Sequence, residues 1–232
     1  MAYQLINPQW AQGRRIQGVL FDMDGVILDS EKLYSRFWQE ALQALGYPMT
    51  REQAIQMRSL NRDAGAAKLQ SFFGPEVDYA AARNKRIELM DLFVRTHGIE
   101  PLPGVYDLLD VLDALGIPAA ITTSSPPERV REYLEPLNLY HRFQAICTVY
   151  QVARGKPEPD IYLFGAESLG LRPEACIAIE DSDTGILSAC RAGCLPVMVP
   201  DQDVPAASTL PRLYALADSL SDIPPILQSV NG

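Results

Sequence analysis

The sequence of 232 residues predicts an α/β fold, in which a parallel sheet carries helices on both faces and a helical segment follows the first strand. Short apolar runs alternate with helical patterns from about residue 104 onward, which is typical of parallel strands joined by crossover helices. One further apolar run lies upstream of this region, and only helical patterns lie between the two. The predicted strands are 19–22, 118–122, 144–148, 176–179 and 195–199.

The helices of the sheet region are predicted from apolar residues that recur three and four positions apart. They cover 105–115, 159–169 and 183–192, and the last of them ends at Gly193, a typical C-cap. Residues 213–217 are predicted to form a last short strand, followed by a tail. We expect residues 1–15 either to pack on the core as an extension or to stay disordered.

A second domain is predicted between the first strand and the alternating region. Its four helices are expected at 31–45, 51–57, 61–72 and 79–96. A stretch rich in Pro and Gly then returns the chain to the sheet. We therefore expect a discontinuous Rossmann-like core, residues 1–29 and 99–232, and an all-helical cap domain, residues 30–98.

Composition excludes several classes of function. The net charge of −9 disfavours nucleic-acid binding, which depends on neutralising phosphates. No apolar run approaches the ~20 residues of a membrane span, and residues 1–15 lack the apolar centre of a signal peptide. The four cysteines lack zinc-ligand spacing and are expected to be buried free thiols. We expect a cytoplasmic protein, a monomer or weak dimer, that binds neither nucleic acid nor membranes.

Two aspartates at the end of the first predicted strand are the most informative feature of the chain. Asp22 and Asp24 follow the apolar run, and residues two apart on an extended strand point to the same side. Gly25 permits the sharp turn that must follow. Two carboxylates this close are unfavourable unless a cation lies between them or one is protonated. The pair therefore indicates a magnesium site, an acid/base pair, or both.

Other polar groups follow the neighbouring predicted strands. Thr123 is followed by two serines, Lys156 precedes a helix, and Glu180 and Asp181 end a third strand. The carboxyl ends of parallel strands meet at one edge of a sheet, where ligands bind. Acidic side chains suit Mg²⁺, hydroxyls and amides suit an anion, and a lysine offsets charge on a transferring group. The combination favours phosphoryl transfer, with an aspartate as a possible covalent nucleophile.

Four segments together resemble the motifs of the haloacid dehalogenase superfamily. They are Asp-Met-Asp-Gly-Val, Thr-Thr-Ser-Ser, Lys-Pro-Glu-Pro-Asp and Ile-Glu-Asp-Ser, in that order. The match is closest to the phosphatase branch with a small helical cap, which includes beta-phosphoglucomutase and sugar-phosphate phosphatases. It covers the chain from about residue 19 to the C-terminus.

The resemblance implies a role for each matching residue. Asp22 would be the nucleophile that becomes an aspartyl-phosphate, and Asp24 the general acid and base. Thr123 and the Ser124 amide would hold the phosphoryl oxygens, with Ser125 nearby.

The same resemblance implies a lysine bridge and a metal site. Lys156 would bridge the nucleophile and the phosphate. Mg²⁺ would be held by Asp181, Asp22 and the backbone carbonyl of Asp24, and Glu180 would support or complete that set of ligands.

Two positions in the predicted cap bear on the substrate. The mutases of this branch carry a histidine where this chain has Tyr34, which weakens the mutase interpretation. Residues 57–63 resemble the substrate-specificity loop of the mutase, with Arg62 at its arginine position. Tyr34 and Arg62 are therefore candidate substrate-binding residues.

The sequence thus predicts a Mg²⁺-dependent phosphatase acting on a small phosphorylated metabolite, such as a sugar or sugar-acid phosphate. The main alternative is a beta-phosphoglucomutase-type phosphosugar mutase. A phosphate sensor without activity would usually lack a nucleophile or a metal ligand, and none is missing here. A dehalogenase would not need Asp24 or the acidic cluster.

Overall fold

The computed structural model describes residues 3–58, 60, 62–201 and 205–232. They form two compact units, Met1–Leu28 with Pro101–Gly232 and Asp29–Glu100, here called unit 1 and unit 2. None of the helices in this described part of the chain is both long and apolar enough to cross a membrane.

Unit 1 is built on a mostly parallel sheet, which confirms the predicted fold class. Across the described residues its strand order is β1-β7-β6-β5-β2-β3-β4, and only β1 and β7 pair antiparallel. The strands are β1 (Tyr3–Leu5), β2 (Gly18–Phe21), β3 (Ala119–Thr123), β4 (Ala145–Thr148), β5 (Cys176–Glu180), β6 (Leu195–Met198) and β7 (Ala215–Ala217).

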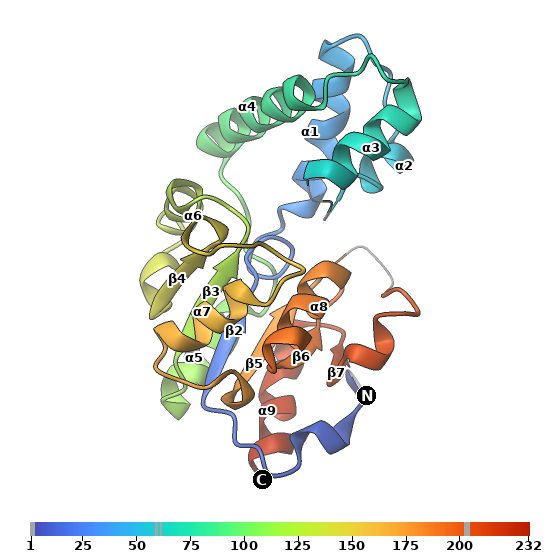
Figure 1. The fold of residues 1–232 in the computed structure, drawn as a ribbon. Helices are drawn as coiled ribbons and strands as arrows, with labels where there is room; N and C mark the ends of the chain where they lie inside the picture. The colour runs from blue at the N-terminus through green and yellow to red at the C-terminus, as the bar shows by residue number, and fades with distance from the viewer. Residues whose placement is uncertain (1–2, 59, 61, 202–204) are drawn as a thin grey trace. The chain divides into compact units, whose positions relative to one another are not determined.

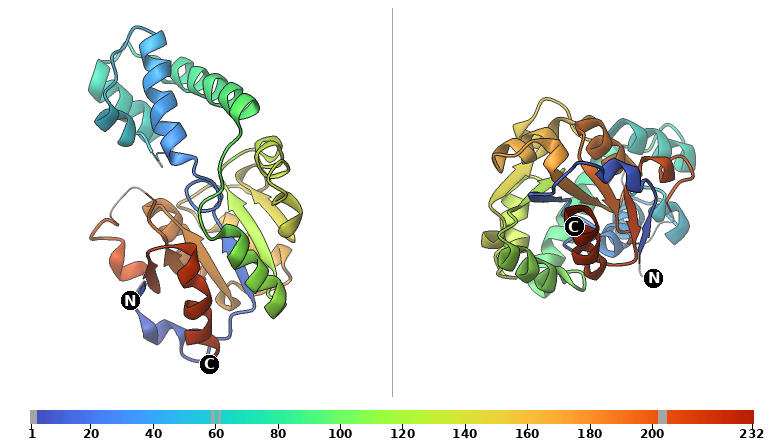
Figure 2. Two further views of the ribbon diagram at one scale, coloured as in Figure 1. Left: turned by 180° about the vertical axis from the view of Figure 1, so that it is seen from behind. Right: turned by 90° about the horizontal axis from the view of Figure 1, so that it is seen from below.

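Helices cover both faces of this sheet. Helices α7 and α8 lie on one face, and α5 and α9 on the other (Figures 1 and 2). The helices of unit 1 are α5 (Val105–Leu115), α6 (Pro127–Leu134), α7 (Asp160–Ser168), α8 (Asp183–Ala192) and α9 (Ile223–Asn231). Short 3-10 helices lie at Pro8–Ala11, Tyr140–Arg142, Val149–Gln151, Pro173–Ala175, Leu210–Arg212 and Leu220–Asp222.

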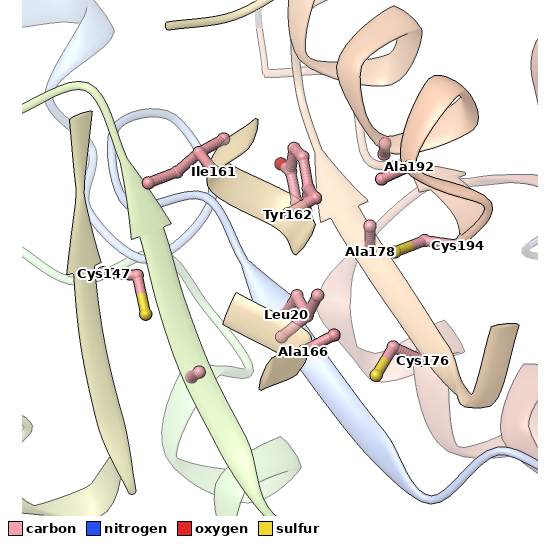
Figure 3. Packing of buried hydrophobic residues seen from close by; sticks show 11 residues of the cluster. Leu20, Cys147, Ile161, Tyr162, Ala166, Cys176, Ala178, Ala192 and Cys194 are labelled. Atoms are coloured by element: carbon pink, nitrogen blue, oxygen red, sulfur yellow. The ribbon is translucent and has the colours of Figure 1, made fainter. Parts of the chain in front are cut away.

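Continuous apolar strands explain why the sheet needs helices on both sides. Every residue of β2, β3 and β5 is buried, so neither face of these strands can remain in water. A core cluster fills the space between the sheet and the two helices α7 and α8. Figure 3 shows Leu20, Tyr162 and Ala178 within this cluster. Burial of this apolar surface is the main driving force for the fold of unit 1.

The two ends of the chain contain a strand and a helix that the sequence patterns did not predict. Residues 3–5 form β1, which pairs with β7, so this part of the N-terminal extension packs on the core, the first of the two expected alternatives. The tail after residue 217 contains a helix, α9. Pro224 and Pro225 are compatible with it because they lie in its first turn, where a missing N–H costs no hydrogen bond.

The described residues of unit 2 form four helices near the predicted positions. They are α1 (Glu31–Ala44), α2 (Arg51–Ile55), α3 (Arg62–Phe73) and α4 (Tyr79–His97). Asn61, where the third helix was expected to begin, lies outside the described residues. The unit has its own apolar core, in which Trp38 and Leu42 of α1 pack with Met57 and Leu69. Asp78 begins α4 by accepting hydrogen bonds from the amides of residues 80 and 81.

Candidate active site

Strand order brings the predicted chemistry to one edge of the sheet. β2 lies between β5 and β3, and the register places Phe21 opposite Ile179 on one side and Ile121 on the other. The residues that follow or end these strands therefore lie next to one another. Gly25 has a φ of +80°, so the backbone after Asp24 turns as a glycine allows.

Lys156 joins the carboxylates of two neighbouring strands. Its Nζ donates to Asp22 Oδ1 at 2.6 Å and to Glu180 Oε1 at 2.5 Å. All three side chains are nearly excluded from solvent, with 9%, 11% and 0% of the Lys156, Asp22 and Glu180 side chains exposed. One buried cation therefore serves two buried anions, an arrangement that requires close pairing to be stable.

The buried pairing shifts the ionisation of both partners. Burial raises the pKa of Asp22 from 3.8 to about 7; Lys156 opposes this, and the carboxylates of Glu180 and Asp24 add to it. Burial lowers the pKa of Lys156, but Asp22 and Glu180 outweigh it and raise the value above the usual range. Lys156 thus stays charged, whereas one lysine does not fully offset the surrounding carboxylates.

A second group of contacts fixes Glu180. The Tyr162 hydroxyl donates to Glu180 Oε1, and Ser182 Oγ donates to Oε2 at 3.1 Å. Burial raises the pKa of Tyr162 well above its usual value, so the phenol keeps its proton and acts as the donor. Ser182 also begins α8, where its Oγ accepts the amide of Gly185 at 3.1 Å.

Three acidic residues offer oxygens to a cation. Carboxylate oxygens of Asp22, Glu180 and Asp181 lie within 4.8 Å of one another. Hard oxygen donors of this kind are what Mg²⁺ prefers. The raised pKa of Asp22 points the same way, because a cation would relieve the surplus negative charge. These residues therefore fit a magnesium ion.

The hydroxyls after β3 lie beside the second aspartate. Ser125 Oγ donates to Asp24 Oδ2 at 2.9 Å, and the Ser125 amide donates to Thr123 Oγ1 at 3.0 Å. Thr123 is 1% exposed and Ser125 is 4% exposed, whereas Ser124 is exposed. The structure thus joins Asp24 to the Thr-Ser-Ser segment, a contact that the sequence did not predict.

Tyr34 and Arg62, the two candidate substrate-binding residues, both belong to unit 2. Tyr34 lies on α1, and the guanidinium carbon of Arg86 lies 4.5 Å from its ring centroid. Arg62 begins α3 and is exposed. Ser59 and Asn61, two positions of the predicted specificity loop, lie outside the described residues. The substrate-binding roles of Tyr34 and Arg62 stay predictions.

The fold and the carboxylate site define a hydrolase class. The family model of haloacid dehalogenase-like hydrolases matches residues 16–193, and the chain belongs to this family. It is 37% identical over 191 residues to hexitol phosphatase A of Escherichia coli, covering 80% of this chain and 83% of that protein. It is 28% identical over 190 residues to beta-phosphoglucomutase of Bacillus subtilis, covering 79% and 83%.

A solved structure extends the likeness to the whole fold. A haloacid dehalogenase family hydrolase from Deinococcus radiodurans, crystallised with bound phosphate and sodium, superposes with a TM-score of 0.75 at 29% identity. The match covers 93% of this chain and 96% of that one. The family assignment from the sequence motifs is thereby confirmed.

Proposed function

We propose that the chain is a Mg²⁺-dependent phosphatase that hydrolyses a small sugar or sugar-acid phosphate through an aspartyl-phosphate at Asp22. The observation that carries this is the buried Asp22–Lys156–Glu180 arrangement with Asp24 two residues from the nucleophile. The name of the hexitol phosphatase relative supports a phosphorylated carbohydrate as the substrate.

In the first half-reaction, a carboxylate oxygen of Asp22 attacks phosphorus and the bond from phosphorus to the ester oxygen breaks. Asp24 gives its proton to the leaving alcohol. Thr123 and Ser124 hold the phosphoryl oxygens. Lys156, already on Asp22, offsets the charge that develops on the transferring group.

In the second half-reaction, Asp24 takes a proton from water as the water attacks phosphorus, and Asp22 is released as a carboxylate. Asp22, Asp181 and the Asp24 carbonyl would hold Mg²⁺, with Glu180 completing the set. The ion, when bound, would neutralise negative charge on the phosphoryl group. Ser125 would keep the Asp24 carboxylate in place between the two steps through its hydrogen bond.

The proposal also gives unit 2 a role. We propose that residues 30–98 act as the cap domain, and that Arg62 and Tyr34 bind the part of the substrate that does not react. The protein is proposed to work in the cytoplasm, where the free cysteines at 147, 176, 190 and 194 would stay reduced.

The test is phosphate release from a panel of phosphorylated metabolites, with and without Mg²⁺, by wild type and Asp22→Asn in parallel. Release that requires Mg²⁺ and disappears in the variant supports the proposal. Its absence with every ester, in folded and Mg²⁺-loaded protein, contradicts it. The mutase alternative would then be tested with beta-glucose 1-phosphate and a bisphosphate primer.

Mg²⁺ should stabilise the protein more at about pH 8 than at about pH 5.5. The pKa of Asp22 is raised from 3.8 to about 7, so the stability linked to its proton is lost as the pH rises through about 7. Mg²⁺ must displace that proton, so acid should weaken its apparent affinity roughly 10-fold or more. The rise in Tm should then be smaller at the acid pH by roughly 3 °C, measured by differential scanning fluorimetry.

Asp22→Asn is the control for this pH effect. Its Mg²⁺-induced rise in Tm should be small and nearly independent of pH. A wild-type rise that is equal at both pH values would show that Asp22 does not release a proton to the ion.

Arg62→Ala should change the preference among substrates and leave the chemistry intact. An arginine suits a second anionic or hydroxyl-rich group of the substrate. We expect the KM for the best sugar phosphate to rise about 10-fold, while kcat with para-nitrophenyl phosphate changes less than about 2-fold. Arg51→Ala, an exposed arginine of the same unit, is the matched control. Equal losses on both substrates would argue against a specificity role.

A further inference from the structure

We propose that Tyr162 is a positioning residue, whose hydroxyl and ring together hold Glu180 and Lys156 in the geometry that the nucleophile requires. The inference rests on the proposed function and assigns this role to a residue outside the four motifs. It follows from the contacts around one buried carboxylate.

Tyr162 contacts both members of the pair. Its hydroxyl donates to Glu180 Oε1, the same oxygen that accepts Lys156 Nζ at 2.5 Å. The Lys156 ammonium also lies 5.2 Å from the centroid of the Tyr162 ring, within the range of a cation–π contact. Two different parts of one side chain therefore restrain the lysine, directly through the ring and indirectly through the shared acceptor.

Hydrogen-bond donors from Lys156, Tyr162 and Ser182 restrict the orientation of the Glu180 carboxylate. A carboxylate oxygen has two lone pairs, and those of Oε1 are taken by Lys156 and Tyr162. Oε2 accepts Ser182 Oγ and retains one lone pair for a cation. Without the phenol, Oε1 would lose a donor in a site where water does not replace it, since Glu180 is 0% exposed.

Helix α8 restrains the same carboxylate from another side. A Cβ built at Gly185 would lie 1.9 Å from Glu180 Cδ, which no real contact allows. The first turn of α8 therefore packs directly on the carboxylate, and only glycine leaves the room. Glu180 is held between this backbone and the Tyr162 hydroxyl.

The ring of Tyr162 is anchored in the apolar core. Tyr162 is 0% exposed and belongs to the cluster with Leu20, Ala166 and Ala178, as Figure 3 shows. A phenylalanine at this position would fill the same apolar space. The change Tyr162→Phe therefore removes the hydroxyl and retains the packing.

Lys156 gains a defined function from this arrangement. An ammonium has three donors, and Asp22 and Glu180 accept two of them. The third remains for a phosphoryl oxygen. Loss of the Tyr162 hydroxyl would let Glu180 and Lys156 shift together, so stabilisation of the transition state should suffer more than substrate binding.

The experiment compares full-length wild type, Tyr162→Phe and Tyr214→Phe with saturating Mg²⁺ and para-nitrophenyl phosphate. Tyr214 is a matched control, a buried tyrosine whose hydroxyl contacts Ser229 Oγ at 3.2 Å. We expect Tyr162→Phe to lower kcat about 10-fold with KM changed less than about 3-fold, and Tyr214→Phe to change neither by more than about 2-fold. A purely structural role would instead lower Tm and leave kcat of the folded protein unchanged.

Gly185→Ala tests the premise that displacement of the Glu180 carboxylate lowers kcat. It keeps Tyr162 but must displace the Glu180 carboxylate, so the same loss in kcat with little change in KM is expected. The inference is overturned if Tyr162→Phe keeps the wild-type kcat, or if Tyr214→Phe loses as much. In either case active wild type and inactive Asp22→Asn would leave the proposed function standing. Wild type without phosphatase activity would overturn both.

Discussion

Asp22→Asn should abolish turnover while the protein stays folded. The amide keeps the size of the side chain but cannot attack phosphorus, so kcat should fall roughly 10⁴-fold or more. The substitution also removes one charge from a buried group of carboxylates that a single lysine does not offset. We therefore expect the Tm without metal to stay the same or rise. Phosphate release and thermal unfolding of the same preparation measure the two effects.

Asp107→Asn is the matched control for this substitution. Asp107 is an exposed aspartate of unit 1 in the first turn of α5 and belongs to none of the four motifs. It should leave kcat and Tm within the error of the wild type. Retained phosphatase activity in Asp22→Asn would remove Asp22 from the role of nucleophile.

Lys156→Met should damage both activity and stability. It leaves Asp22 and Glu180 buried without their cation, and breaking a buried pair in this way costs about 3–5 kcal/mol. The penalty should be largest at about pH 8 and shrink in acid, because Asp22 can then take up a proton. Saturating Mg²⁺ should restore part of it. Urea unfolding at two pH values, with and without Mg²⁺, measures each of these effects.

Lys32→Met tests whether burial makes the difference. Lys32 Nζ lies 2.5 Å from Asp29 Oδ2, the same distance as from Lys156 Nζ to Glu180 Oε1. The Lys32 side chain is 64% exposed, so its loss should cost less than about 1 kcal/mol. Similar losses in the two variants would contradict the assignment of Lys156 as the partner of a buried nucleophile.

Most of the fold could be predicted because the central strands are fully buried. The runs in β2 and β5 contain so few polar residues that they are expected to be buried. Their alternation with helical patterns along the chain predicts a parallel sheet. β1 could not be predicted, because three residues of mixed polarity become a strand only through pairing with β7. α9 was hidden by two prolines that disfavour a helix interior but suit its first turn.

The candidate site likewise contains residues that the sequence could predict and residues that it could not. Asp22, Lys156 and Glu180 could be named from motifs because each lies near the end of a predicted strand or the start of a predicted helix, and the structure joins them directly. Tyr162 and Gly185 could not, since neither residue type indicates a role by itself. Their contacts with Glu180 depend on how α7 and α8 pack on the sheet. The sequence marks Tyr162 only as an aromatic residue with a hydroxyl group, placed between the apolar residues Ile161 and Leu163 of α7.

Transfer of the phosphoryl group to Asp22 can be detected by mass spectrometry after acid quench. Asp24→Asn is the protein to use, with para-nitrophenyl phosphate as the substrate. Nitrophenolate leaves without a proton, so phosphorylation can proceed, whereas hydrolysis lacks its general base. We expect a phosphoryl group on the peptide that contains Asp22 and on no other. A phosphoryl group on a different residue, or none while the wild type turns over, would contradict transfer to Asp22.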